Sequence, residues 1–336
     1  MGPGLTYAAF DRTDDRGTVR VHVLTARWTQ TGLVLDQVSP DAVASRAALL
    51  TMVGGDRGVA GVNGDFFDIG VTNAPLGVAK DRQRGVLHGP RTGRTLAFVI
   101  TSTGVPDVRR ISLAGSVRPL NRPRLTLTNK NSPEVAVDGI GLYTTSWGGM
   151  PGPDVVGSAS VVRQVVVDGG RVVANRATLS AAGKPMVGRV LIGRGDGALA
   201  LAGLRVGTKV RVGAHLSVPV QMAMGGGDEL LRDGSLVTSA DVLAHPRTAI
   251  GIDRDRHLLH LVTVDGRSES SSGYTLLQLA RLMRSLGDED AMNLDGGGSS
   301  EMVAKGPDGG PLEVRNAPSD GHERLVANGL VFRYVG

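Results

Sequence analysis

Short apolar runs separated by polar turns recur along the chain, and this pattern predicts a strand-rich protein. Residues 18–25 alternate apolar and polar side chains, which is the period of a half-buried strand. Other runs with strand character lie at 32–38, 59–63, 95–101, 108–117, 161–174, 205–218, 247–253, 258–264, 291–294 and 325–334. Glycine occurs 49 times in the chain, about twice its usual share. Because these glycines are dispersed, they indicate many tight turns rather than a flexible linker.

Two segments carry the start and stop signals of helices. Ser39–Asp41 offers an N-cap followed by a proline, and the apolar spacing that follows ends at Gly54. Thr275 and Gln278 fit a capping box ahead of an apolar helical stripe that ends at Gly287. With so few helices among so many strands, we expect an α+β fold of mixed, strand-rich sheets and a few covering helices.

The length of 336 residues is compatible with one large domain or two ordinary ones. No disordered linker and no repeat of 20–50 residues divides the chain. The middle part is rich in β-branched residues and turn signals and lacks chemical motifs. We therefore expect a single unit over residues 1–336 with a peripheral β-rich insertion at about 118–220.

Composition excludes several classes of protein. The chain has no cysteine, so it has neither disulfides nor thiolate metal sites. No run of 18 apolar residues is present, so no integral membrane segment is expected, and the first residues lack the layout of a signal peptide. The net charge is +5, but the basic residues are scattered and aromatic residues make up only 3%. This composition argues against nucleic-acid binding.

Polar residues follow several apolar strands at the point where each strand ends. The segments are Asn63–Asp68, Asp265–Arg267 and Asn293–Ser300. Strand ends are rigid platforms, and carboxylates that meet there can act as acid, base or nucleophile. A single segment of this kind is often only an Asx turn. Its recurrence at several strand ends favours a shared pocket.

The sequence holds no zinc-protease, P-loop, nucleophile-elbow or EF-hand motif. Arg247 precedes an apolar strand and Arg267 ends the next one, and each could bind an anion or form an ordinary salt bridge. Aspartate and backbone oxygens are acceptable ligands for calcium or magnesium, but no segment has a dedicated ligand spacing. The sequence therefore requires no cofactor.

Five motifs follow one another along the chain: Asn63–Phe67, His245–Gly251, Val264–Arg267, Asn293–Ser300 and Asn316–Asp320. Together and in this order, they resemble the phosphodiester glycosidase family. The resemblance runs from about residue 59 to the C-terminus at 336, and a Gly-rich segment at 225–234 looks like a further family element. Bacterial members of the family are associated with exopolysaccharide, so the resemblance implies a secreted or envelope-associated glycosidase acting on a carbohydrate or sugar-phosphate substrate.

Cleavage of a sugar 1-phosphodiester, as the resemblance implies, passes through an oxocarbenium-like transition state and releases a weakly basic phosphomonoester. The reaction needs a carboxylate as nucleophile or base, and charge neutralisation for the phosphate. Asp65 and Asp295 are the first catalytic candidates, with Asp265 next. Candidate substrate-binding residues are Asn63, Phe66, Arg247, Arg267, Asn293, Gly296, Gly297, Gly298, Ser299, Ser300, Asn316 and Asp320. The amides of residues 296–298 would form an anion nest.

Two other functions remain open at this point. One is a glycosidase that cleaves a non-phosphorylated polysaccharide with the same carboxylates. The other is a non-catalytic polysaccharide-binding module, against which the number of acidic strand ends argues. The sequence leaves the oligomeric state undetermined.

Overall fold

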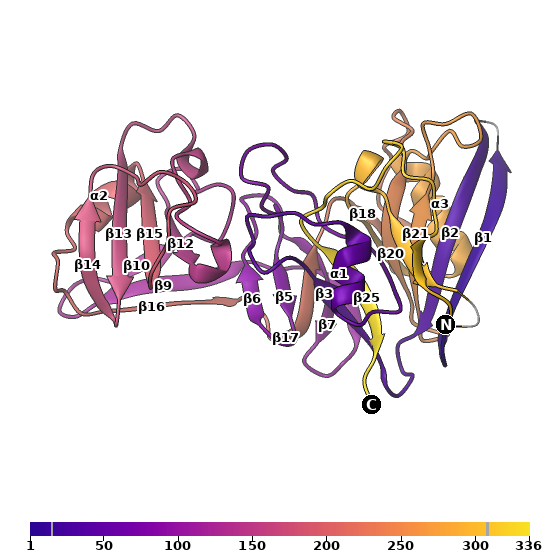
Figure 1. Ribbon diagram of the computed structural model, residues 1–336, viewed down its shortest axis with the longest axis horizontal. Helices are drawn as coiled ribbons and strands as arrows, with labels where there is room; N and C mark the ends of the chain where they lie inside the picture. Colours follow the sequence, from indigo (N-terminus) through magenta and orange to yellow (C-terminus); the bar gives the residue numbers. More distant parts are fainter. Residues whose placement is uncertain (15, 307–308) are drawn as a thin grey trace.

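The computed structural model describes residues 1–14, 16–306 and 309–336, which fold into two lobes side by side along the long axis (Figure 1). The larger lobe contains both chain termini and three β-sheets. The smaller lobe, residues 111–216, contains two β-sheets and leaves the larger lobe as a long ribbon of two strands.

Three antiparallel sheets build the larger lobe. Sheet 1 has the order β1 (Leu5–Asp14), β2 (Gly17–Arg27), β21 (Leu258–Val264), β20 (Arg247–Asp253), β22 (Asp290–Asn293), β18 (Glu229–Arg232) and β19 (Ser235–Leu236). Sheet 2 has the order β24 (Leu312–Val314), β23 (Met302–Lys305), β4 (Ala60–Asn63), β25 (Gly329–Tyr334) and β3 (Leu33–Val38). Sheet 3 has the order β6 (Gly85–His88), β5 (Ala79–Asp81), β17 (Val220–Gly225), β7 (Leu96–Thr101) and β8 (Pro106–Arg110).

One apolar core joins these three sheets. Ile250 and Leu261 from sheet 1, Val62 and Phe332 from sheet 2, and Met224 from sheet 3 belong to the same buried cluster. The opposite face of sheet 1 is covered by α3 (Leu276–Leu286), and that of sheet 2 by α1 (Leu49–Gly55). Because both faces of the sheets are buried, their central strands carry apolar residues on both faces.

Of the two helices predicted from the sequence, one is confirmed and the other begins at a different residue. The capping box of α3 is confirmed, since the Gln278 amide donates to Thr275 Oγ1 at 3.2 Å, and Gly287 ends the helix with φ of 99°. The expected helix start near residue 41 is wrong, because α1 begins at Leu49. The amides of Val43 and Ala44 donate to carbonyls of residues 146 and 147 in the smaller lobe, so this segment is held in an irregular path.

The smaller lobe packs one sheet on another. A three-stranded sheet, β10 (Leu125–Leu127), β9 (Leu113–Pro119) and β16 (Val210–Leu216), lies against a five-stranded sheet and α2 (Asp196–Ala202). The larger sheet has the order β11 (Asn129–Lys130), β12 (Ile140–Thr144), β15 (Arg189–Arg194), β13 (Val162–Asp168) and β14 (Arg171–Arg176). Within the described residues, β11 and β12 form the one parallel pair of the fold.

The two lobes share a junction core. Val43, Ala74 and Leu87 of the larger lobe pack with Tyr143 and Trp147 of the smaller lobe. The two aromatic rings meet edge to face at 5.1 Å. This apolar contact adds to the ribbon of β9 and β16 and fixes the smaller lobe against the loop that follows β4.

The strand-rich prediction is confirmed, although the sheets are almost entirely antiparallel rather than mixed. The run at 108–117 belongs to two strands, β8 and β9, in different sheets, because the chain crosses from one lobe to the other near Ile111. The α2 helix was not anticipated. Among the described residues, no helix has the length and apolar character needed to cross a membrane.

Candidate active site

Strand ends from two sheets meet at one rim of the larger lobe. In sheet 2, Asn63 at the end of β4 pairs with Gly329 at the start of β25. In sheet 1, Asn293 at the end of β22 pairs with Ala249 of β20, and Arg247 pairs with Val264 at the end of β21. Antiparallel pairing thus brings the start of one strand beside the end of the next. The polar segments that follow β4 and β22 lie together, since the Asp295 amide bonds to the carbonyl of Gly64.

Asn63 joins the two sheets at this rim. Its side-chain amide donates to the carbonyl of Asp295 at 2.7 Å, and its Oδ1 accepts from Thr248 Oγ1 at 2.6 Å and from the Glu301 amide at 3.0 Å. The Asp295 amide donates in turn to the carbonyl of Gly64 at 2.8 Å. These bonds occupy both polar atoms of the fully buried Asn63, so its side chain positions the 293–301 loop rather than a sugar hydroxyl.

Asp65 is a buried carboxyl with one unused oxygen. Its Oδ2 accepts from the Gly77 amide at 2.5 Å, and its own amide donates to Asn328 Oδ1 at 2.8 Å. Oδ1 has no hydrogen-bond partner among the described residues. The pKa of Asp65 is raised to about 8, chiefly by burial and to a lesser extent by the charge of Asp295, while the Gly77 amide and Arg94 oppose the rise. This carboxyl is therefore protonated at neutral pH.

Asp295 is the second carboxyl of the site and is partly exposed. Its Oδ1 accepts from the Gly296 amide at 2.9 Å. Burial raises the pKa of Asp295 to about 6, and the Ser299 hydroxyl, the Gly296 amide and the charges of Arg324 and Arg94 limit that rise. Asp295 is thus ionised at neutral pH. The charge of Arg94 acts on both Asp65 and Asp295, so these three residues share one electrostatic environment.

Three arginines border this pair of carboxyls. The Arg94 guanidinium lies over the ring of the partly exposed Phe66, with 5.1 Å from Cζ to the ring centroid. Arg247 donates through Nε to the carbonyl of Tyr274. Burial lowers the pKa of Arg247, the charge of Asp228 opposes this change, and the charge of Arg267 adds to it. Within the described ranges, none of the three forms an ion pair with a carboxylate. The site therefore holds positive charge that is available to an anionic ligand.

Arg267 is the most exposed of these arginines and has a φ of 58°, in the left-handed region. Its guanidinium lies 3.4 Å from His245 Nδ1 and close to Gly297. Burial and the charges of Arg247 and Arg267 lower the pKa of His245, so that imidazole is neutral at physiological pH. The two arginines and the glycine loop form one cationic wall.

Asp265 and Asn316 bind each other instead of facing the site. Asp265 Oδ1 accepts from Asn316 Nδ2 at 3.2 Å and from the Ala317 amide at 3.0 Å, and Oδ2 pairs with His22 Nε2 at 3.2 Å. Asn316 also accepts from the Met302 amide at 2.8 Å. With all the side-chain oxygens of the two residues engaged, the buried Asp265 fastens the 316–317 segment to sheet 1 and is not placed to reach a sugar.

The amides of the glycine loop do not form the expected anion nest. The Gly296 amide donates to Asp295, and the Gly297 amide donates to the carbonyl of Pro246 at 2.9 Å. The segment folds as a 3₁₀ turn, η3 (Gly297–Ser299), which directs these donors into the protein. Gly298 packs against the ion pair of Asp320 and Arg324, so Asp320 is neutralised by its neighbour.

Three other predicted residues lie at the site with side chains buried. Asn293 and Ser300 each have a buried side-chain oxygen, Oδ1 and Oγ, without a hydrogen-bond partner among the described residues. Ser299 lies beside Asp295 and is buried as well. A ligand or water could use the unpaired oxygens.

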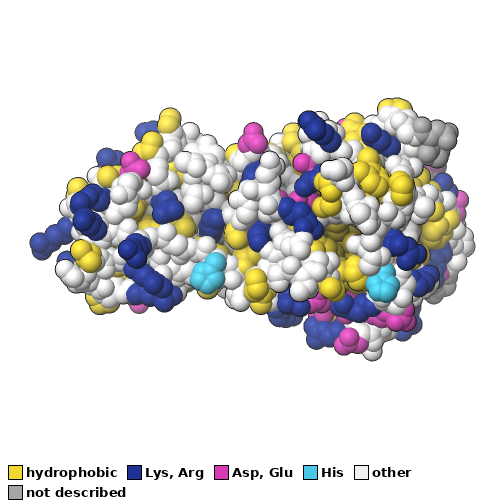
Figure 2. Space-filling view, turned by 90° about the horizontal axis from the view of Figure 1, so that it is seen from below, with side chains coloured by type: hydrophobic (Ala, Val, Ile, Leu, Met, Phe, Trp, Pro, Cys, Tyr) yellow, Lys and Arg dark blue, Asp and Glu magenta, His cyan; other side chains and the backbone are white. Residues whose placement is uncertain are grey.

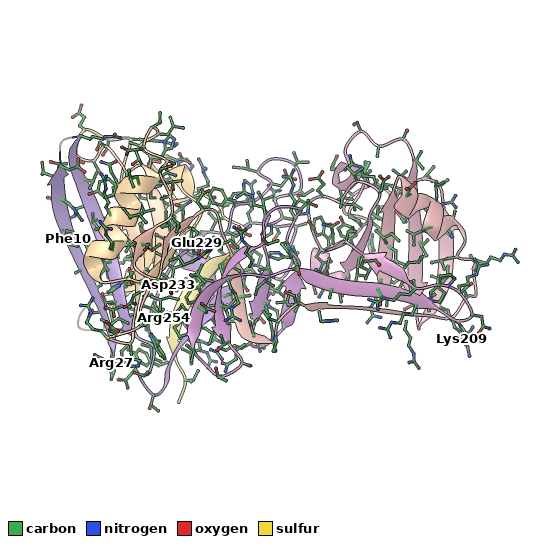
Figure 3. The ribbon with its side chains drawn as sticks, turned by 180° about the vertical axis from the view of Figure 1, so that it is seen from behind. Phe10, Arg27, Lys209, Glu229, Asp233 and Arg254 are labelled. Atoms are coloured by element: carbon green, nitrogen blue, oxygen red, sulfur yellow. The ribbon has the colours of Figure 1, made fainter. Side chains whose placement is uncertain are left out.

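A polar pocket of about 390 Å³ adjoins the carboxyl pair. It is lined by Gly93, Arg94, Leu96, Arg110, Gly226, Gly227, Asp228 and Glu229. A Cβ placed on Gly227 would lie 2.8 Å from Phe66 and 3.1 Å from Asn293 Nδ2, which connects this pocket to the predicted site. Its volume suits a small ligand. The Glu229 label in Figure 3 marks its position on the larger lobe.

Sequence reasoning missed several residues that shape the site. Arg94 lies in a turn without a motif, and Asn328 precedes the last strand. Gly77 and Gly225 approach so closely that a Cβ on either would lie within 2.8 Å of Asp65 Oδ2. Of these residues, only the glycines could have been found from the sequence, because an isolated Gly at a strand end indicates that another part of the backbone approaches closely.

Comparisons with known proteins agree with this fold. The sequence profile of the phosphodiester glycosidase family matches residues 158–333. A segment of 108 residues is 41% identical to the uncharacterised SPbeta prophage-derived protein YomE of Bacillus subtilis (strain 168); the match covers 32% of this chain and 16% of that protein. The chain therefore matches only a small part of this relative's length.

Solved structures with this architecture come from several organisms. A hypothetical protein from Synechocystis superposes with a TM-score of 0.82 at 25% identity, over 98% of this chain and 62% of that one. A Burkholderia pseudomallei protein, provisionally described as exported, superposes with a TM-score of 0.76 at 25% identity, over 94% of this chain and 74% of that one. A third structure is the catalytic domain of zebrafish N-acetylglucosamine-1-phosphodiester α-N-acetylglucosaminidase, auto-inhibited by its pro-peptide. It superposes with a TM-score of 0.52 at 17% identity, over 99% of this chain and 85% of that one.

Replacing Gly77 by alanine tests how Asp65 is held. The added Cβ would lie 2.6 Å from Asp65 Oδ2 and 2.7 Å from Gly225 Cα, so the backbone must shift and weaken the hydrogen bond to Asp65. We expect a loss of about 1–3 kcal/mol of stability and a further rise in the pKa of Asp65, measured by denaturation and by carboxyl ¹³C NMR. Gly213→Ala, with open space around its Cβ, is the control and should change neither quantity.

Proposed function

Since the chain belongs to the phosphodiester glycosidase family, we propose that it hydrolyses the anomeric bond of a sugar 1-phosphodiester. The observation that carries this proposal is the pairing of two carboxyls in opposite protonation states, Asp65 and Asp295, with three arginines that lack carboxylate partners among the described residues. A neutral glycan would leave that positive charge unused. A phosphodiester would neutralise it.

The proposed mechanism gives each group one task. Asp295, ionised above pH 6, acts on the anomeric carbon as nucleophile or through a water that it deprotonates. Arg247 and Arg267 bind the departing phosphate, and Arg94 balances the charge of the carboxyl pair. Asp65, protonated below pH 8, donates a hydrogen bond or a proton to the leaving oxygen. The anomer formed first, read by proton NMR, distinguishes a direct attack by Asp295 from activation of water.

We further propose that the substrate is a bacterial envelope or exopolysaccharide glycan and that the protein acts outside the cytoplasm. The provisionally exported structural neighbour supports this location. The first compound to test is an N-acetylglucosamine 1-phosphodiester, the substrate class named for the zebrafish neighbour. Other sugars and both anomers complete the panel.

Substitution of the two carboxyls separates their roles. Asp295→Asn should lower kcat by roughly 10²–10⁴-fold on every substrate, because the acting carboxylate is lost. Asp65→Asn should have a small effect on a phosphodiester and a larger one on an analogue with a more basic leaving group, because only the latter needs protonation. Steady-state kinetics on paired substrates measures this. Full activity in both variants would refute the assignment.

On the analogue with the more basic leaving group, which needs protonation, the two pKa values predict a bell-shaped dependence of kcat/KM on pH. Activity should rise as the pH passes about 6, where Asp295 loses its proton, and fall above about 8, where Asp65 loses its proton. Asp65→Asn should remove the alkaline limb and keep the acidic one. An alkaline limb that persists in this variant would show that another group titrates there.

Arg267 provides the test between a phosphodiester and a neutral glycan. Its guanidinium is exposed and contacts only His245 among the described side chains, so Arg267→Gln should leave the fold intact. We expect kcat/KM to fall about 10–100-fold on a sugar 1-phosphodiester, as for loss of a charged hydrogen bond, and little on an aryl glycoside. Equal losses on both, or turnover of the aryl glycoside alone, would favour the neutral-glycan reading. Saturable glycan binding without product would favour a binding module.

We propose that this hydrolysis needs no resident cofactor. Within the described ranges, no cluster of three or more His, Asp and Glu side chains is arranged to hold a metal ion. Activity should survive dialysis against EDTA and should not increase when calcium or magnesium is added. Loss of activity that either cation restores would contradict this proposal.

A further inference from the structure

The smaller lobe carries the excess positive charge of the chain. Residues 111–220 contain thirteen Lys or Arg and five Asp or Glu, a net charge of +8. The whole chain has a net charge of +5, so the remaining residues have a net charge of −3. Figure 2 shows more dark blue than magenta side chains over this lobe, on the left of the view. The net charge of the whole chain therefore does not reveal that the smaller lobe is basic while the rest of the chain is slightly acidic.

Three loops meet at the end of the smaller lobe that is farthest from the candidate active site. We call residues 119–124, 168–171 and 203–209 the distal tip. The Leu120 amide donates to the carbonyl of Lys209 at 3.0 Å, and the Val210 amide donates to the carbonyl of Gly170 at 2.9 Å. Arg171 donates to the carbonyl of Gly207 at 3.1 Å. In Figure 3, Lys209 marks this end of the molecule.

The distal tip is basic and lacks compensating acids. Its exposed basic residues are Arg122, Arg124, Arg171, Arg205 and Lys209, and its one acidic residue is Asp168. None of these basic side chains forms an ion pair in the described part of the chain. Just behind the tip, Arg118 of β9 stands directly opposite Arg211 of β16. Like charges in such a cross-strand pair repel each other, so an external anion would stabilise this surface.

Two large aliphatic side chains project from the same loops. Leu120 is 63% exposed and Val206 is 64% exposed. On the neighbouring helix α2, Leu199 is 64% exposed as well. The three loops contain no aromatic residue. Exposed aliphatic side chains surrounded by basic ones are typical of surfaces that dip into the interface of an anionic membrane.

We propose that the distal tip is a peripheral binding surface for an anionic phospholipid membrane. Leu120 and Val206 enter the interfacial region, and the surrounding Arg and Lys bind lipid phosphates. An anionic polysaccharide or a nucleic acid would use the charges but would leave the aliphatic side chains in water, and no aromatic ring is present to stack on sugars or bases. An anionic membrane accounts for both features. This surface is independent of the proposed hydrolysis.

The experiment is co-sedimentation of the full chain with vesicles of phosphatidylglycerol and phosphatidylcholine in equal parts, compared with pure phosphatidylcholine. We expect binding to the anionic vesicles only, weakening as salt rises. The variant Arg122→Gln/Arg124→Gln/Lys209→Gln should bind about fivefold more weakly per charge removed, or on the order of a hundredfold in total. Leu120→Ser/Val206→Ser should bind about tenfold more weakly while its salt dependence is kept.

Matched substitutions on the larger lobe are the controls. Arg281→Gln removes an exposed charge from α3, and Val242→Ser removes an aliphatic side chain that is 87% exposed. Both should bind like the unmodified chain. Equal binding to both kinds of vesicle, or no binding to either, would overturn the proposal. So would full binding by Leu120→Ser/Val206→Ser, especially if duplex DNA or dextran sulfate bound equally well, because the surface would then be a general polyanion site.

A second measurement does not depend on loss of binding. The chain has no cysteine, so Val206→Cys can carry a single polarity-sensitive fluorophore. Its emission should shift to the blue with anionic vesicles, and the same label at Val242→Cys should not shift. An unchanged spectrum at position 206 while the protein sediments with vesicles would mean that another face contacts the membrane, and would also overturn the proposal.

Discussion

The hydrogen bonds of the Asn63 side chain hold the candidate active site together. This amide is buried where sheet 1 and sheet 2 meet, and it bonds to the backbone of Asp295 and Glu301 and to the Thr248 hydroxyl. The two candidate carboxyls come from loops that follow strands of different sheets. Their relative position is therefore determined by this one side chain and by the amide of Asp295 that bonds back to Gly64. A polar group without these partners would be costly to bury here.

The electrostatics of the site follow from that placement. Burial favours the neutral form of both carboxyls, but Asp65 is more enclosed than Asp295, and the charge of Arg94 acts on both. The result is one protonated and one ionised carboxyl at the same pH, which is the arrangement that acid–base chemistry requires. The two arginines of the cationic wall donate to backbone carbonyls or contact His245, and neither forms an ion pair in the described part of the chain.

Local patterns in the sequence predict the strands well and the α3 helix almost to the residue, because Thr275, Gln278 and Gly287 act within a few positions of one another. They fail where distant backbone determines the conformation, as for residues 43–47, which bond to the smaller lobe and to Val326 instead of forming a helical turn. The candidate site likewise combines features that local patterns predict with others that depend on distant residues. Strand-end motifs indicated where polar groups gather, but no local signal reveals that Asp265 and Asn316 bind each other or that Arg94 arrives from a turn.

The paired strands β9 and β16 have an evolutionary consequence. The chain leaves the larger lobe at Leu113 and returns at Leu216, and these residues are partners in one antiparallel ladder. Their Cα atoms are therefore about 5 Å apart. A tight turn could join them, so the entire smaller lobe could be lost, exchanged or enlarged without altering the path of any strand that builds the rim. The apolar residues of the junction core, such as Val43 and Ala74, would need replacement by polar ones, and the amides of residues 43 and 44 would need new partners.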